Sequence, residues 1–140
     1  MPKGTLEVLL LNAKGLQTTD FLCKMDPYCI IKCRTQQQKS TVASDQGRNP
    51  EWNEKFLFNI SEGVSDLVIR IMDKDTFTAD DFIGEANIPL DGVFEAGNLP
   101  PLTYNVVMGD YTYCGQIKVG LTFIPKTEKK HGGPGNEEEQ

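Results

Sequence analysis

Short runs in which apolar and polar residues alternate recur along this chain of 140 residues, and they predict β-strands. Phe56, Phe58 and Ile60, for example, share one face of such a run because successive strand side chains point to opposite sides. Clusters of Gly, Asn, Asp and Pro separate the runs and predict turns. We expect eight strands, over Thr5–Leu11, Tyr28–Arg34, Lys39–Ala43, Trp52–Ile60, Leu67–Met72, Ile83–Pro89, Thr103–Val107 and Gln116–Ile124.

The order of these runs favours an all-β fold. Strands do not alternate with helices, and the only helical feature expected is one short turn at Asp91–Ala96. Eight short strands in this order predict an eight-stranded antiparallel β-sandwich. We expect one domain over residues 1–125. Residues 126–140 are charged and rich in glycine with no core positions, which predicts a disordered tail.

The cysteines and the apolar runs indicate the cellular compartment expected for this domain. The four cysteines form no CxxC pair, and Cys29 and Cys33 are about 13 Å apart on one predicted strand, too far for a disulfide. Buried thiols in a reducing compartment are therefore expected, which favours the cytoplasm. No apolar run approaches the roughly 20 residues that a membrane-spanning helix needs.

Five aspartates are spaced in two related groups that each follow a strand-like run. They are Asp20 and Asp26, six apart, and Asp73, Asp75 and Asp81, spaced two and six. A single aspartate in a loop is most often a turn former, but carboxylates gathered at strand ends repel one another unless a cation lies between them. Calcium takes six to eight oxygen ligands, so two such loops at one end of a sandwich predict a calcium site.

Two other kinds of site are excluded by residue positions. An EF-hand beginning at Asp73 would need Gly at its sixth position and Glu at its twelfth, and the chain has Thr78 and Gly84 there. The only histidine, His131, lies in the expected tail, so no Ser-His or Cys-His pair can form on the fold. We therefore expect a protein that is not an enzyme.

The net charge of −6 is concentrated in the predicted site. The tail contributes −1, and the five spaced aspartates equal the remaining −5 of residues 1–125. Two or three calcium ions would bring +4 to +6 and cancel or reverse that charge, which predicts a switch for an anionic surface. An isoelectric point near 4.8 argues against nucleic acid as a partner.

Four segments together resemble the C2 domain, a calcium-dependent lipid-binding β-sandwich, over residues 4–125. They are MDPYC at 25–29, NPEWNE at 49–54, DKD at 73–75 and DDFIGE at 80–85. The resemblance is greatest to small plant C2 proteins of the elicitor-responsive type, which implies a role in defence signalling. It also implies that the five aspartates bind two or three calcium ions, with Thr78 as a further hydroxyl ligand.

The family has two circularly permuted topologies. Only four residues precede Thr5, too few for another strand, so the eighth strand must come late, at Thr103–Val107. This order favours the second topology.

Apolar residues flank the aspartates. Phe21, Leu22 and Phe77 are expected at the tips of the two loops, where calcium would bridge lipid phosphates while the side chains enter the membrane interface. For Phe21 and Leu22 the alternative is packing back onto the sandwich. A second surface of interest carries three basic residues and is either a headgroup patch, as in the family, or an ordinary solvated face. Its residues are Lys32, Arg34 and Lys39.

These expectations combine into one functional hypothesis. The chain is predicted to be a monomeric, calcium-dependent phospholipid-binding module that is recruited reversibly from the cytoplasm to anionic membranes. A signalling protein is a further candidate partner. The alternative is an adaptor in which calcium only orders the loops for a protein partner, without direct lipid binding.

Overall fold

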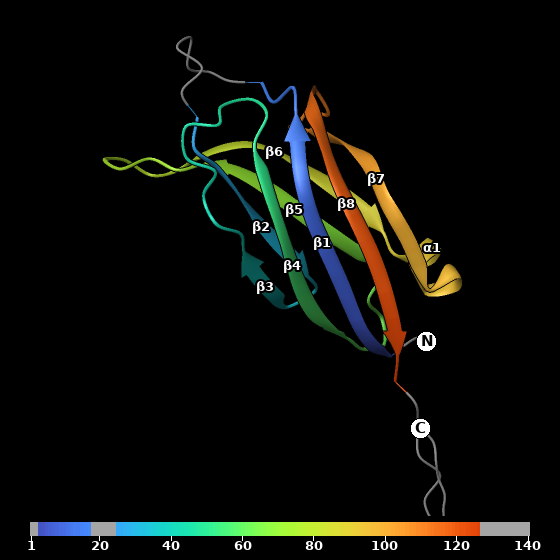
Figure 1. The fold of residues 1–140 in the computed structure, drawn as a ribbon. Helices are drawn as coiled ribbons and strands as arrows, with labels where there is room; N and C mark the ends of the chain where they lie inside the picture. Colours follow the sequence, from blue (N-terminus) through green and yellow to red (C-terminus); the bar gives the residue numbers. More distant parts are fainter. Residues whose placement is uncertain (1–2, 18–24, 127–140) are drawn as a thin grey trace, which may run out of the picture.

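The computed structural model describes residues 3–17 and 25–126, which form an antiparallel β-sandwich (Figure 1). The eight strands are hydrogen-bonded in the order β3-β2-β5-β6-β7-β8-β1-β4. The all-β, eight-stranded antiparallel prediction is confirmed. The elements are β1 Gly4–Lys14, β2 Pro27–Cys33, β3 Gln36–Lys39, β4 Glu51–Ile60, β5 Asp66–Asp73, β6 Asp81–Pro89, α1 Asp91–Ala96, β7 Asn98–Val107 and β8 Tyr113–Pro125.

The strands form two layers that face each other across the core. β3, β2, β5 and β6 make one layer, and β7, β8, β1 and β4 make the other (Figure 1). The layers are joined where β6 meets β7, and the register there contains the single pair Glu85–Val107. Successive side chains of a strand point to opposite faces, and on β1 the inward residues Leu6, Val8 and Leu10 are fully buried. The same period of two that predicted the strands therefore builds the core.

The third strand differs from its predicted position. It covers Gln36–Lys39, whereas Lys39–Ala43 was expected, so that boundary was wrong. A tight turn brings the chain back directly after β2, with Arg34 at a φ of 60°. Three glutamines carry no strand-like hydrophobic pattern, but their amides bind across the open edge. Gln36 and Gln38 donate to the carbonyls of Asn59 and Leu57 on β4, at 2.5 and 2.6 Å.

A late strand is present, as expected. β7 contains Thr103–Val107 and extends back to Asn98, with a register shift between Leu99 and Leu102. Pro100 and Pro101 lie in that shift, and proline cannot donate a hydrogen bond to a ladder. In the described residues β1 is the first strand. The second topology stays a prediction that this strand order supports.

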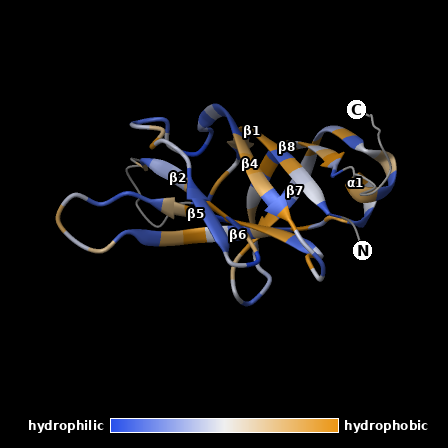
Figure 2. Cartoon of the chain, turned by 90° about the horizontal axis from the view of Figure 1, so that it is seen from below, coloured by the Kyte–Doolittle hydropathy of each residue, from blue (hydrophilic) through white to orange (hydrophobic). Residues whose placement is uncertain are grey.

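The two ends of the sandwich differ in what they carry. The strands that lead to the two termini end together, as Lys126 N donates to Lys3 O at 2.8 Å. The opposite end carries the β5–β6 connection, which projects beyond the body of the sandwich (Figures 1 and 2). Three cysteines lie in the described residues, Cys29, Cys33 and Cys114, and all three are buried free thiols. No helix in that part of the chain is long and apolar enough to cross a membrane.

Candidate metal centre

Three of the predicted aspartates lie at the ends of three neighbouring strands. Pro27 on β2 pairs with Asp73 on β5, which places Asp26 next to Asp73. Asp73 in turn pairs with Asp81, the first residue of β6. Directly paired residues on antiparallel strands have Cβ atoms roughly 5 Å apart. The register of the sheet therefore brings Asp26 of the first sequence group beside Asp73 and Asp81 of the second.

Backbone hydrogen bonds fix this arrangement. Asp26 N donates to Asp73 Oδ1 at 2.9 Å, and Lys74 N donates to Asp26 O at 3.0 Å. A third connection, between β3 and β4, joins them because Asp45 N donates to Asp26 Oδ1 at 2.7 Å. These hydrogen bonds connect the segments around residues 26, 45 and 73 without a bound ion.

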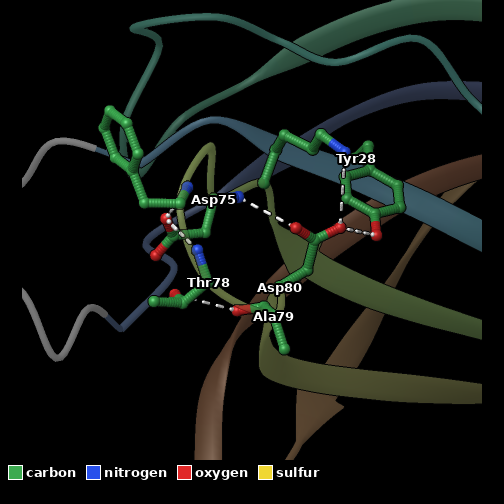
Figure 3. Close-up of polar contacts among 7 residues, drawn as sticks. Tyr28, Asp75, Thr78, Ala79 and Asp80 are labelled. Carbon is green, nitrogen blue, oxygen red and sulfur yellow. Dashed lines mark hydrogen bonds and ion pairs between the residues drawn. The ribbon is translucent and has the colours of Figure 1, made fainter.

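Asp75 shapes the projecting loop. Its Oδ1 accepts hydrogen bonds from Phe77 N at 3.0 Å and from Thr78 N at 3.3 Å (Figure 3). This is the local side-chain to backbone turn that aspartate favours. The bond from the Phe77 amide, followed by those from the Thr78 hydroxyl and the Thr78 amide, lowers the pKa of Asp75, so it stays ionised. An ionised carboxylate is the form that a cation needs as a ligand.

The pKa of Asp73 reflects its burial and the negative charges around it. Burial is the largest cause that raises the pKa of Asp73, and the charges of Asp26, Asp81 and Asp75 raise it further. The hydrogen bond from the Asp26 amide acts in the opposite direction. Three carboxylates therefore interact unfavourably with that of Asp73, and the attraction of a bound cation would offset this repulsion. An all-oxygen, anionic set fits calcium.

The side chains are not closed around an ion position. Within the described residues, no three Asp, Glu, His or Cys side chains converge closely enough to enclose a metal. Asp26, Asp73 and Asp75 each direct Oδ1 to a backbone amide. Asp20, Phe21 and Leu22 lie outside the described residues, so three predicted members of the site stay predictions.

Asp80 is a site residue that the sequence interpretation missed. Its Oδ1 accepts from Asp75 N at 2.9 Å, and its Oδ2 accepts from Tyr28 Oη at 2.5 Å (Figure 3). Lys74 Nζ lies 3.9 Å from the same Oδ2. Asp80 therefore closes the base of the loop that carries Asp75. The doublet Asp80–Asp81 was the available signal, but spacing alone does not tell which aspartate faces its own loop.

Phe77 lies on the loop between these aspartates and is 94% exposed. The flanking Thr76 and Thr78 are exposed too, so the ring has no apolar support from its neighbours. A single exposed apolar side chain is common on protein surfaces, so the exposure of Phe77 gains meaning only from its place beside the aspartates. Its exposure agrees with the expected position at a loop tip.

The three basic residues do not form a uniform patch. Lys39 Nζ lies 5.9 Å from the centre of the Tyr28 ring, and an Arg34 guanidinium nitrogen donates to Glu62 O at 2.5 Å. Lys32 and Arg34 line an open pocket of about 440 Å³. That pocket also contains Arg70, Asp66 and Glu85. Arg70 thus adds a charge that the sequence interpretation missed, and the two acids offset part of the basic charge.

A family model described as C2 domain matches residues 4–106, about three quarters of the chain. The chain belongs to the C2 domain family.

Two known proteins are similar to this chain over nearly its whole length. Elicitor-responsive protein 3 of Oryza sativa subsp. japonica is 53% identical over 94% of this chain and 91% of its own length. A solved C2 domain-containing protein from a putative elicitor-responsive gene is 52% identical, with a TM-score of 0.80, over 97% of this chain and 95% of that one. The expected likeness to small plant C2 proteins is confirmed, and neither name denotes an enzyme.

A calcium-bound structure is also similar. The pair of C2 domains of Extended-Synaptotagmin 2, solved with calcium, matches with a TM-score of 0.74 and 28% identity. The match covers 89% of this chain and 47% of that one.

Proposed function

We propose that this protein is a calcium-dependent module that binds anionic phospholipid membranes. The observation that carries the proposal is the placement of Asp73, whose pKa is raised by burial and then by the charges of Asp26, Asp81 and Asp75, near Phe77, which is 94% exposed. Asp73, Asp75 and Asp81 lie at the ends of and within the β5–β6 connection that carries Phe77, and Asp26 lies beside Asp73. The calcium-bound structure of a similar C2 protein supports calcium as the ion.

In this proposal, Asp26, Asp73, Asp75 and Asp81 hold two or three calcium ions, and Asp20 completes the set. When bound, the ions supply positive charge and coordination positions for lipid phosphate oxygens. Residues of the chain itself position the loop and contact the membrane. Asp80 holds the loop base through Asp75 N and Tyr28 Oη, and Asp75 holds its tip through Phe77 N. Phe77 then enters the membrane interface.

Reversibility follows from the small number of anchors. Fully burying one side chain such as that of Phe77 contributes about 1.5–3 kcal/mol, which alone gives weak binding. Phe21 and Leu22 are proposed as additional contacts of the first loop. We propose that the protein acts in the cytoplasm and associates peripherally with a membrane when calcium rises. Lys32, Arg34 and Lys39, with Arg70, are proposed as a secondary contact for headgroups.

Co-sedimentation with vesicles tests this function. Vesicles of mixed phosphatidylserine and phosphatidylcholine are compared in calcium and in chelator. The wild type is expected to sediment only with calcium, and Asp73→Asn to lose both calcium binding and sedimentation. Phe77→Ala should keep calcium binding by calorimetry but lose about tenfold in vesicle affinity. Leu57→Ala is the matched control, because Leu57 is 55% exposed on β4, away from the loop.

Two outcomes would redirect the proposal. Equal sedimentation in chelator would contradict the calcium switch. Calcium binding by the wild type without any vesicle association would favour the alternative, an adaptor whose loops calcium orders for a protein partner. That alternative is weaker because Phe77 alone is a small anchor for a protein interface.

A further inference from the structure

The turn between β7 and β8 presents an aromatic ring that the proposed function does not use. Tyr111 is 85% exposed, so its ring adds almost nothing to the packing of the fold. Its backbone has a φ of 67°, a left-handed conformation that is unfavourable for a bulky side chain. Glycine or asparagine would suit this backbone conformation better, so neither packing nor the backbone of the turn accounts for a tyrosine here.

Hydrogen bonds within the turn fix its backbone. Tyr111 N donates to Met108 O at 2.8 Å, and Met108 N donates to Thr112 O at 2.9 Å. Asp110 Oδ1 accepts from Thr112 N at 3.0 Å, so the one acidic group of the turn is bonded back onto the turn itself. A hydrogen-bonded turn loses little further backbone freedom when its tip meets another surface.

The position of this turn relates it to the candidate metal centre. Val107, the last residue of β7, pairs with Glu85 of β6, and β6 begins at Asp81. Cys114 Sγ donates to Ile83 O at 3.4 Å, which holds the start of β8 beside the start of β6. The turn therefore emerges at the end of the sandwich that carries the aspartates, but from the other layer (Figure 1).

We propose that the β7–β8 turn is a second lipid-contacting element, with Tyr111 lying at the headgroup level of the membrane. Tyrosine suits this depth because its ring is apolar and its hydroxyl remains hydrated. Phe77 extends from the layer of β5 and β6, and Tyr111 from the layer of β7 and β8. One aromatic ring from each layer fixes the tilt of the domain, whereas a single anchor leaves it free to pivot.

This inference rests on the proposed function. The partner that we propose for Tyr111 is a lipid surface. A protein partner would require a cluster of buried anchors around the ring. The neighbouring exposed side chains in the turn offer instead a mixed apolar and polar rim, which matches the interfacial zone of a bilayer. They are Met108, Asp110, Thr112 and Tyr113.

The decisive variant is Tyr111→Asn, because asparagine tolerates the left-handed backbone. We expect its melting temperature to stay the same or rise, while its affinity for phosphatidylserine and phosphatidylcholine vesicles in calcium falls about threefold to tenfold. Stability and binding would then move in opposite directions, which a folding defect cannot produce. Ile124→Thr is the matched control, because Ile124 is 50% exposed at the end of β8, near the termini.

A second variant locates the ring directly. Tyr111→Trp should show a blue-shifted emission on vesicles in calcium, and quenching by lipids brominated along their chains. Trp52 is the only native tryptophan and is buried, so it gives a constant background. Unchanged affinity of Tyr111→Asn, or no quenching of Tyr111→Trp, would overturn the inference while wild-type binding upholds the proposed function. Absence of wild-type binding would overturn both.

Discussion

At the scale of single residues, the contact between Tyr28 and Asp80 shows how the projecting loop is held. Tyr28 is buried at the start of β2, and its hydroxyl donates to Asp80 Oδ2 at 2.5 Å. This bond is the largest cause that raises the pKa of Tyr28 to about 12, followed by burial and by the charge of Asp80. It also lowers the pKa of Asp80, second to the bond from Asp75 N. The pair links the sandwich to the loop.

The raised pKa of Tyr28 makes stability depend on alkaline pH. The ordinary pKa of tyrosine is 10.0, so between 10 and about 12 the folded chain binds a proton that the unfolded chain has lost. The stabilisation is complete below pH 10 and is lost as the pH rises toward 12, by about 1–2 kcal/mol. Tyr28→Phe should lack this loss, which urea unfolding at several pH values measures.

Absorbance titration of the phenols provides the control. The component near pH 12 should disappear in Tyr28→Phe and persist in Tyr111→Phe, which removes one exposed phenol instead. Persistence of that component in Tyr28→Phe would contradict the assignment.

Residue spacing was informative for the aspartates because strand periodicity is regular. Asp73 and Asp81 were expected in one calcium site from their spacing after an apolar run, and the register places them side by side, while their binding of an ion stays a prediction. The role of Asp80 was not predictable, because it depends on Tyr28, which lies 52 positions away in the sequence. Local patterns identify candidate ligands, but not the long-range contacts that orient them.

At the scale of elements, strand boundaries were predictable where apolar and polar residues alternate regularly. They were mispredicted where side-chain hydrogen bonds, rather than that alternation, accompany the strand. β4 was expected over Trp52–Ile60 and differs by one residue, because its apolar residues alternate regularly. β3 was misplaced because Gln36 and Gln38 hold it through side-chain amides that reach β4. The hydropathy pattern contains no information on such hydrogen bonds, so the bounds of this edge strand could be read only from the structure.

The junction between β6 and β7 depends on a glycine. A Cβ at Gly84 would lie 2.4 Å from Cys114 Sγ, 2.7 Å from Val106 Cγ1 and 3.2 Å from Val107 O. Gly84→Ala should therefore destabilise the fold by about 1–3 kcal/mol, because overpacking forces the two layers apart. Urea unfolding measures the loss. Adding Cys114→Ala should restore part of it by removing the nearest atom.

Gly109 is the matched control for this prediction. An added Cβ there meets nothing within 4 Å, and its φ is not positive. Gly109→Ala should change stability by no more than about 0.5 kcal/mol. Equal effects of the two substitutions would show that the junction does not depend on close packing at Gly84.

At the scale of the whole molecule, two mechanisms could link the net charge of −6 to membrane recruitment. Calcium could act only by removing repulsion between the protein and an anionic surface. Alternatively, it could bridge carboxylates and lipid phosphates directly. Burial first, and then the charges of Asp26, Asp81 and Asp75, raise the pKa of Asp73, so some repulsion exists inside the cluster. Removing that repulsion does not by itself create an attraction to the membrane. The proposed function requires the bridge.

A variant with Asp26, Asp73, Asp75 and Asp81 all changed to Asn separates the two mechanisms. It changes the formal net charge from −6 to −2 without any ion. Asparagine keeps an acceptor oxygen for the backbone amides that Asp26, Asp73 and Asp75 bind, so the loops should stay folded. Its melting temperature in chelator should equal or exceed that of the wild type, because the repulsion around Asp73 is gone.

We expect this variant to leave anionic vesicles unbound in both calcium and chelator, because neutral amides cannot hold an ion that bridges to phosphate. Co-sedimentation beside the calcium-loaded wild type measures the difference. If the variant sedimented in chelator as well as the wild type does in calcium, charge removal alone would explain recruitment. The aspartates would then act as a repulsive barrier, and calcium would serve only to neutralise them.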